Sequence, residues 1–306
     1  MKKIITRKMS APAKRKNLES VAVKKVKQTT LIPVNNTPKD GGTGVFSGDS
    51  ISIACWNVNG IRACIQKPGF QSFKSIKTLD ILCFNETKLQ DVHVPGIRSQ
   101  LSEFPYQYWS CSRTKLGYSG TAILSKIQPI SWAEGLKGHP EEGRLTLAEF
   151  DTFFVVCTYV PNSGKDRFEY RLNNWDPDLC SFITDLHSRG KEVIWLGDLN
   201  VINLDMDIHR LKGNEKHAGA TPEERKSFHK TLSTGLVDSF RWKYPERVQY
   251  SWYSAISKTS REKKEGWRID MAVVTEGMTE RIIDSIIHDD VMGSDHHPIE
   301  ILIKNK

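Results

Sequence analysis

Short apolar runs that end in turn-forming residues recur through the sequence after residue 49. They are Ile51–Trp56, Asp80–Phe84, Gly120–Leu124, Leu145–Phe150, Phe153–Val160, Val193–Leu196, Ile269–Val274 and Ile299–Ile303. Runs of this length, bounded by Gly, Asn or Asp, are typical of β-strands. Several are apolar throughout instead of alternating with polar residues. This pattern predicts strands that are buried on both faces of a layered structure.

Helical patterns lie between these runs. Residues Phe168–Ser188 carry apolar side chains at the i, i+3/i+4 spacing of an amphipathic helix. Thr221 and Pro222 supply a helix cap and a proline at the first helical position, and the pattern continues to Leu232. Because strands outnumber helices and mix with them, we expect an α/β or α+β sandwich with one core.

Positive charge is concentrated at the start of the chain. The first 50 residues hold eleven Lys and Arg against three acids, a net charge of +8, which equals the net charge of all 306 residues. No aromatic residue precedes Phe46. We therefore expect residues 1–48 to be a disordered basic tail and residues 49–306 to be a single domain.

The tail has three interpretations. It could be a solubilising leader without further function. Lys14–Lys16 and Lys24–Lys27 together look like a two-part nuclear import signal. The acid-free start, up to Lys16, could instead be a mitochondrial address. We expect a nuclear protein, with the mitochondrion as the alternative.

Apolar segments and cysteines exclude other classes of protein. No run of about 18 apolar residues occurs, so no transmembrane helix or membrane partner is expected. The first residues also lack the apolar segment of a signal peptide. None of the six cysteines forms a Cys-x-x-Cys pair, and most lie in apolar runs. We expect buried free thiols in a reducing compartment.

Acids and amides stand at the ends of several predicted strands. They are Asn57 and Asn59, Glu86, Asp198 and Asn200, Asp270, and the pair Asp295 and His296 before the last strand. One polar residue at a strand end is usually turn chemistry, but burying Asp270 inside an apolar run is costly unless it has a partner. Magnesium prefers oxygen ligands and keeps waters for substrate phosphates. The set therefore favours a metal-dependent hydrolytic site. A Ser-His-Asp hydrolase is disfavoured because no Gly-x-Ser-x-Gly motif occurs.

Eight blocks of sequence occur in a fixed order between about residues 51 and 303. They are WNVNGIRA from Trp56, ETK from Glu86, GYSG from Gly117, YVPNSG from Tyr159, GDLNV from Gly197, KGN from Lys212 with AGATPEER from Ala218, GWRID from Gly266 and GSDH from Gly293. Together they resemble the exonuclease III-type AP endonucleases. This resemblance implies a four-layered α/β sandwich, in which two packed mixed β-sheets are flanked by helices and the active site lies at one edge.

The resemblance also implies an activity. It implies a magnesium-dependent phosphodiesterase of base excision repair, with manganese as a possible substitute. Such an enzyme nicks double-stranded DNA 5′ to abasic sites, trims blocked 3′ ends as a 3′–5′ exonuclease and works as a monomer. One alternative is a superfamily relative that acts on another phosphoester, such as an RNA deadenylase, an inositol-lipid phosphatase or a DNase I-like nuclease. Another is a non-catalytic nucleic-acid-binding protein that kept the fold.

The same resemblance implies roles for individual residues. Glu86 would bind the metal ion, and the residues expected around the ion are Glu86, Asn57, Asp198, Asn200, Asp295 and His296. Asp198 would deprotonate the attacking water or protonate the leaving oxygen, and the sequence leaves both possibilities open. Asn162, Asn200 and Tyr159 would contact the phosphate. His296, oriented by Asp270, would donate to the non-bridging oxygens.

Contacts with DNA follow from the resemblance as well. The residues expected at the DNA backbone are Arg62, Lys67, Tyr118, Lys212 and Asn214. Trp267 and the segment Tyr250–Tyr253, which includes Trp252, would form an aromatic pocket that accepts a sugar without a base and excludes ordinary nucleotides. Asn59 departs from the animal members, which tend to have an acid at this position.

Overall fold

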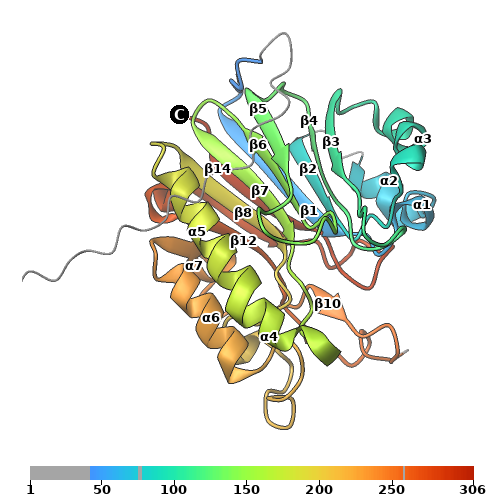
Figure 1. Cartoon of the computed structure of the whole chain (residues 1–306), viewed down its shortest axis with the longest axis vertical. Helices are drawn as coiled ribbons and strands as arrows, with labels where there is room; N and C mark the ends of the chain where they lie inside the picture. The colour runs from blue at the N-terminus through green and yellow to red at the C-terminus, as the bar shows by residue number, and fades with distance from the viewer. Residues whose placement is uncertain (1–41, 75–77, 258) are drawn as a thin grey trace, which may run out of the picture.

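Two six-stranded sheets form the centre of the computed structural model, which describes residues 42–306 except 75–77 and 258 (Figure 1). The first sheet has the order β13-β14-β1-β2-β4-β3 and the second has the order β5-β6-β7-β8-β12-β9. Each sheet contains one parallel pair, β1 with β2 and β7 with β8, and its other neighbours are antiparallel. Both sheets are therefore mixed, as expected.

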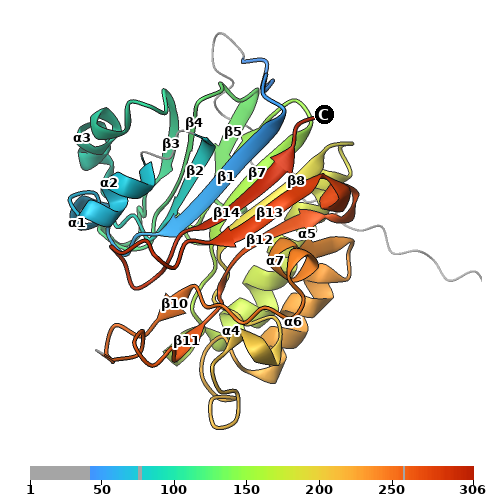
Figure 2. The same cartoon turned by 180° about the vertical axis from the view of Figure 1, so that it is seen from behind.

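The bounds of the strands are as follows. The first sheet contains β1 (Ser50–Asn57), β2 (Leu79–Asn85), β3 (Tyr106–Ser110), β4 (Thr121–Ser125), β13 (Ile282–Ile287) and β14 (Ile299–Lys304). The second sheet contains β5 (Ser131–Glu134), β6 (Leu145–Glu149), β7 (Phe153–Tyr159), β8 (Glu192–Asp198), β9 (Leu236–Asp238) and β12 (Asp270–Thr275). A two-stranded ribbon of β10 (Trp252–Tyr253) and β11 (Gly266–Trp267) lies beyond one edge of both sheets (Figure 2).

Helices cover the outer faces of the sandwich. The α-helices are α1 (Ile61–Cys64), α2 (Pro68–Lys74), α3 (Val94–Arg98), α4 (Phe168–Tyr170), α5 (Asp176–His187), α6 (Pro222–Leu232) and α7 (Ser239–Lys243). Short 3-10 turns occupy Asp91–His93, Ser99–Leu101, Lys165–Arg167, Asp205–Asp207 and Glu276–Arg281. Figure 1 shows α1, α2 and α3 on the side of the first sheet and α5 and α6 on the side of the second.

Three apolar clusters hold these layers together. The largest lies between the sheets and contains residues from both, such as Ile53 and Val155. A second cluster joins the first sheet to α1 and α2 through Trp56, Phe70 and neighbouring side chains. A third joins the second sheet to α5 and α6. The helix–sheet–sheet–helix arrangement confirms the predicted four-layered sandwich.

All eight predicted strands are present. The predicted helix over Phe168–Ser188 is also present, as α4 and α5 joined by a π-helical segment at Arg171–Trp175. The Oγ1 of Thr221 accepts a hydrogen bond from the Glu224 amide at 3.3 Å, which confirms the predicted cap of α6. The sequence analysis did not predict β3, β5, β9, β10, β11 or β13. These strands are short or partly exposed, so their side chains lack a continuous apolar run.

The chain packs onto the domain earlier than residue 49. Phe46 is buried, and its ring lies 5.2 Å from that of Phe150 and 5.9 Å from that of Phe153. The side-chain amide of Asn305 donates to the carbonyl oxygen of Phe46 at 2.7 Å. Residues 42–48, which the sequence analysis assigned to the tail, thus belong to the packed part of the chain. The proposed targeting signals lie in residues 1–41, outside the described residues.

The cysteines agree with the expectation of free thiols. The six cysteines are free thiols, and all except the half-buried Cys180 are buried. Within residues 42–306, apart from the gaps, no helix is long and apolar enough to cross a membrane.

Candidate active site

Strand ends from both sheets meet at one edge of the sandwich. Asn57 is the last residue of β1, Glu86 follows β2, and Tyr159 and Asp198 end β7 and β8. β12 runs antiparallel to β8, and its first residue, Asp270, pairs with Asp198. The ends of parallel strands lie at the same edge of a sheet, so this topology gathers residues that are far apart in the sequence.

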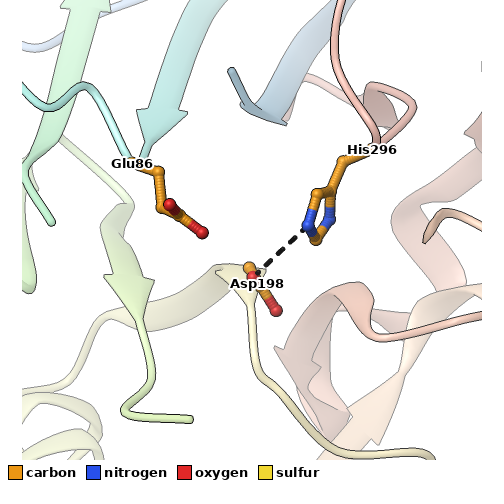
Figure 3. Close-up of side chains that lie close together, drawn as sticks. All are labelled: Glu86, Asp198 and His296. Atoms are coloured by element: carbon orange, nitrogen blue, oxygen red, sulfur yellow. Dashed lines mark ion pairs between the residues drawn. The ribbon is translucent and has the colours of Figure 1, made fainter. Parts of the chain in front are cut away.

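Two of these side chains, Glu86 and Asp198, converge on a third, His296, which precedes β14. Glu86, Asp198 and His296 each offer one ligand atom, and these atoms lie within 4.8 Å of one another (Figure 3). Asp198 Oδ2 lies 3.9 Å from His296 Nε2. Two carboxylates at this distance are a donor set that suits a divalent cation, and the imidazole faces them. Glu86 also forms an ion pair with a side chain, because Lys88 Nζ lies 2.9 Å from its Oε2.

Asn57 holds the two carboxylates of this cluster together. Its Nδ2 donates to Glu86 Oε1 at 3.1 Å and to Asp198 Oδ2 at 2.9 Å. Its Oδ1 accepts the Asn59 amide at 3.1 Å and therefore faces away from the cluster. Asn57 was expected near the metal ion. In the structure its side-chain nitrogen orients the two carboxylates, and its side-chain oxygen is used by the Asn59 amide instead.

Asp198 is buried and tightly held. Besides Asn57, its Oδ1 accepts the amide of Asn200 at 3.0 Å, and its own amide donates to Asn85 Oδ1 at 2.8 Å. Burial raises the pKa of Asp198 to about 7, helped by the charges of nearby carboxylates and opposed by His296. A carboxyl group with a pKa near neutrality can accept or donate a proton at the pH of the cell. Asp198 is therefore suited to proton transfer.

His296 is held in one orientation by a chain of hydrogen bonds. Its Nδ1 lies 2.8 Å from Asp270 Oδ2, and this oxygen also accepts the Ser251 hydroxyl at 2.7 Å. Burial lowers the pKa of His296, but the charges of Asp270, Asp198 and Asp295 outweigh it and raise the pKa to about 10. The imidazole is therefore positively charged at neutral pH. The partner expected for the buried Asp270 is thus present.

Asp295 lies at the side of the cluster. Its Oδ1 accepts Asn59 Nδ2 at 2.9 Å, and its Oδ2 accepts Trp252 Nε1 at 3.3 Å. Burial raises its pKa, but His296 and these hydrogen bonds lower it overall. Among the described residues the tight three-atom cluster does not include Asp295. Asn59, where animal members tend to have an acid, here donates to this carboxylate.

The two asparagines expected at the phosphate form a chain beside Asp198. Asn200 Nδ2 donates to the Val160 carbonyl at 2.9 Å, and Asn162 Nδ2 donates to Asn200 Oδ1 at 3.1 Å. Asn200 also adopts a left-handed backbone conformation with φ +49°, which asparagine tolerates better than most residues. The structure therefore places Asn200 against protein atoms and leaves Asn162 nearer to solvent.

Tyr159 lies beside the carboxylates with its hydroxyl protonated. Burial, followed by the negative charges of Glu86 and Asp198, raises the pKa of Tyr159 well above its ordinary value. A neutral phenol can donate a hydrogen bond to a phosphate oxygen. The expected contact of Tyr159 with the phosphate stays a prediction.

A cleft of about 610 Å³ opens above the cluster. Its lining includes Glu86, Tyr159, Asn162, Asp198, Asn200, Asn214, Trp252, Trp267, Asp295 and His296. The rings of Trp252 and Trp267 lie 5.8 Å apart and nearly perpendicular, and form its aromatic wall. Ser251, expected in this wall, is instead fully buried beneath it as the partner of Asp270. Tyr250 and Tyr253 do not line the cleft.

The sequence analysis missed several residues of the cleft. His209 and His217, from the loop after β8, line it, but a histidine in a polar loop gives no sequence signal. Ser251 was expected in the aromatic wall, but its hydrogen bonds with Asp270 were not, because they depend on the pairing of β10 with β11 and on the approach of β12.

The residues expected at the DNA backbone lie outside the cluster. Arg62 and Lys212 are exposed, and Lys67 Nζ donates to the Gly293 carbonyl at 2.6 Å. Tyr118 is half-buried and accepts Arg144 Nη2 at 2.7 Å. Asn214 lines the cleft, and its side chain donates to the Arg210 carbonyl.

Comparisons with known proteins agree with this geometry. An exodeoxyribonuclease from Bacillus subtilis is 41% identical over 83% of this chain and 99% of its own length. A DNA repair nuclease from Danio rerio is 38% identical over 89% of this chain and 86% of its own length. The crystal structure of an AP endonuclease from Leishmania major superposes with a TM-score of 0.74 at 28% identity, over 84% of this chain and 89% of that one.

The family assignment rests on a match that spans most of the chain. The sequence profile of the endonuclease/exonuclease/phosphatase family matches residues 54–296, which include Asn57, Glu86, Asp198 and His296. Nucleases of this family depend on a metal ion, and the cluster at the strand ends is the place where this chain could hold one. The chain belongs to the endonuclease/exonuclease/phosphatase family, and the relatives that match most of its length are DNA-cleaving hydrolases of DNA repair.

Proposed function

We propose that this chain is a DNA repair phosphodiesterase that cleaves double-stranded DNA 5′ to abasic sites and removes blocked 3′ ends. The observation that carries the proposal is the convergence of Glu86, Asp198 and His296 beneath an aromatic-walled cleft. The names of the relatives, which include an AP endonuclease and an exodeoxyribonuclease, support the same substrate class.

Magnesium is the cation that we propose for the cluster, with manganese as a substitute. Glu86 and Asp198 would hold it with His296 nearby, and the expected Asp295 would contribute from the side of the cleft. When bound, the ion supplies charge stabilisation to the phosphate in the transition state. The donor set fits a divalent cation, because the three carboxylates of Glu86, Asp198 and Asp295 outnumber the cationic groups beside them, which are Lys88 and His296.

The protein side chains would divide the remaining chemistry. Asp198 exchanges a proton with a reacting oxygen, either that of the attacking water or that of the leaving group. The His296 imidazolium and the Tyr159 hydroxyl donate hydrogen bonds to phosphate oxygens, where negative charge grows in the transition state. Asn162, with Asn200 behind it, supplies a further amide near the phosphate.

The shape of the cleft supports selection of an abasic sugar. Trp252 and Trp267 line the cleft with their rings nearly at right angles. A sugar without a base can enter such a pocket more easily than an intact nucleotide. We further propose that the chain acts as a monomer in the nucleus, with the mitochondrion as the alternative location.

Cleavage of a defined duplex tests the proposal. One strand carries a single synthetic abasic site, and matched duplexes carry an ordinary nucleotide or a 3′-phosphate end. We expect a nick 5′ to the abasic site, removal of the 3′-phosphate, loss of both activities in EDTA and recovery with magnesium. Equal cleavage of the undamaged duplex, or full activity in EDTA, would contradict the proposal.

A further inference from the structure

A buried arginine lies directly behind Tyr159. Arg144 precedes β6 and is only 3% exposed. Its Nη1 donates to the Tyr159 carbonyl at 3.2 Å, and its own carbonyl accepts the Tyr159 amide at 2.9 Å. Its guanidinium carbon lies 4.9 Å from the centre of the Tyr159 ring. Arg144 thus contacts both the backbone and the ring of Tyr159.

The same guanidinium reaches a second tyrosine on another loop. Arg144 Nη2 donates to the Tyr118 hydroxyl at 2.7 Å, and the guanidinium carbon lies 5.3 Å from the centre of the Tyr118 ring. Tyr118 precedes β4 of the first sheet, whereas Tyr159 ends β7 of the second. One side chain therefore links the end of a strand of the second sheet to the loop that precedes a strand of the first.

An acidic side chain fixes the orientation of Arg144. Its Nε donates to Glu142 Oε2 at 2.6 Å, and Arg167 forms two further hydrogen bonds to the same carboxylate at 2.8 and 2.9 Å. Burial raises the pKa of Glu142, but these two arginines outweigh it and lower the pKa to about 2. Glu142 is therefore a permanent anion, which makes burial of the Arg144 charge tolerable.

We propose that Arg144 is a positioning residue that holds Tyr159 in its place beside the carboxylates and couples it to Tyr118. Each nitrogen of its planar guanidinium has a different partner, and three directed bonds from one rigid group define an orientation. A lysine could replace the charge but not this fork. The inference rests on the proposed function, because it assigns a purpose to Tyr159 in that reaction.

A double-mutant cycle tests whether Arg144 acts through Tyr159. Single-turnover cleavage of the abasic duplex is measured for wild type, Arg144→Gln, Tyr159→Phe and the double variant. Arg113→Gln is the matched control, because Arg113 is an exposed arginine of the neighbouring loop that pairs with Glu134. We expect Arg144→Gln to slow wild type by about 10-fold or more, since small misplacements of reacting groups are costly, and to slow Tyr159→Phe by less than about threefold. Arg113→Gln should be close to wild type.

Equal fractional losses in both backgrounds would overturn the proposal, because they would mean that Arg144 supports the fold or the DNA contact independently of Tyr159. DNA affinity, measured by fluorescence anisotropy, should change by less than about threefold in Arg144→Gln if positioning is its main role. If Arg144→Gln does not fold, Arg144→Lys enters the same cycle.

A second measurement needs no substrate. With tyrosine ring carbons labelled for NMR, Arg144→Lys should move the signals of both Tyr159 and Tyr118, whereas Arg113→Lys should leave them in place. Unchanged signals in Arg144→Lys would overturn the inference even if the enzyme is active. A shifted pair of signals in a protein that does not cleave abasic DNA would preserve the positioning role and reject only the proposed function.

Discussion

At the scale of single residues, the candidate catalytic groups are buried charges that lie close to one another where the two sheets meet. Asp198, Asp270 and His296 are each less than 5% exposed. Burial alone would neutralise such groups, but here each charge has a partner at hydrogen-bond or ion-pair distance. Bringing buried charges together costs free energy, and groups with perturbed pKa values cluster at active sites. Their assembly here is therefore consistent with a functional role.

Removing the charge of Glu86 tests its assignment to the metal. We expect Glu86→Gln to lose at least about 100-fold in cleavage rate at low magnesium, the scale of one charge-stabilising group. The magnesium concentration that gives half the maximal rate should also rise. A magnesium titration of the rate measures both effects. Glu103→Gln is the control, because Glu103 is a partly exposed acid that pairs with Lys74. An unchanged half-maximal magnesium concentration would remove Glu86 from the metal site.

The raised pKa of His296 makes a prediction about pH. Its folded pKa of about 10 exceeds the ordinary value of 6.5, so its stabilisation is fully present below about pH 6.5 and is lost as the pH rises toward 10. Asp270→Asn removes the strongest charge that raises this pKa. We expect the pKa of His296, followed by NMR, to fall, and the alkaline loss of stability and the rate optimum to move to lower pH. The exposed Asp290→Asn should leave all three unchanged. An unaltered titration of His296 in Asp270→Asn would contradict this account.

At the scale of elements, the segment of residues 267–270, from the end of β11 to the start of β12, contains one ring of the aromatic wall and the partner of His296. Arg268 is fully buried between Trp267 and Asp270, where it forms ion pairs with Asp207 at 2.7 Å and with Asp238 at 2.6 Å. The pairs connect this segment to the turn before Ile208 and to the end of β9. They fix where Trp267 and Asp270 lie relative to the second sheet.

Breaking these pairs should destabilise the fold. Arg268→Met leaves the carboxylates of Asp207 and Asp238 buried without their main partner, which typically costs about 3–5 kcal/mol. Urea unfolding measures the loss, and Arg113→Met, at a largely exposed arginine, should change stability by less than about 0.5 kcal/mol. A loss below about 1 kcal/mol for Arg268→Met would show that the segment is held mainly by apolar contacts.

Elements also show which features the sequence can predict. The central strands could be predicted from the continuously apolar runs, because a strand that is buried on both faces has apolar residues at successive positions. Edge strand β13 contains Asp284 and Ser285 within IIDSII, so its pattern is interrupted. The partner of Asp270 was expected from the cost of burying a carboxylate, whereas Ser251 and Arg144 were not. Their roles arise from contacts between segments that are far apart in the sequence, and neither residue interrupts an apolar run.

At the scale of the whole molecule, the distribution of charge separates the domain from the tail. Residues 51–306 are balanced in charge, while the eleven Lys and Arg of the first 50 residues all lie before residue 40. DNA carries about one negative charge per 1.7 Å of its axis. We therefore expect the domain to bind DNA through local groups such as Arg62, Lys67 and Lys212, and we expect the tail to add contacts to the phosphates.

Removal of the tail tests whether it adds DNA contacts to those of the domain. Each neutralised phosphate adds about 0.9 to the slope of log K against log salt. If three or four tail bases contact DNA, deletion of residues 1–41 should flatten the slope by roughly 3 and leave turnover at saturating DNA nearly unchanged. Residues 42–48 are kept because Phe46 packs into the core. Binding to an abasic duplex at several salt concentrations measures the slope, and superimposable slopes would leave the tail as a targeting segment only.

Asp198 lies where both sheets meet, so its position depends on the whole fold. We propose that it transfers a proton at a metal-dependent site. The most direct test is the single-turnover rate of Asp198→Asn on a duplex with one abasic site at saturating magnesium. We expect a loss of at least about 100-fold, while Asp205→Asn, a change at an exposed acid of a neighbouring loop, stays close to wild type. A near-normal rate for Asp198→Asn would contradict the mechanism.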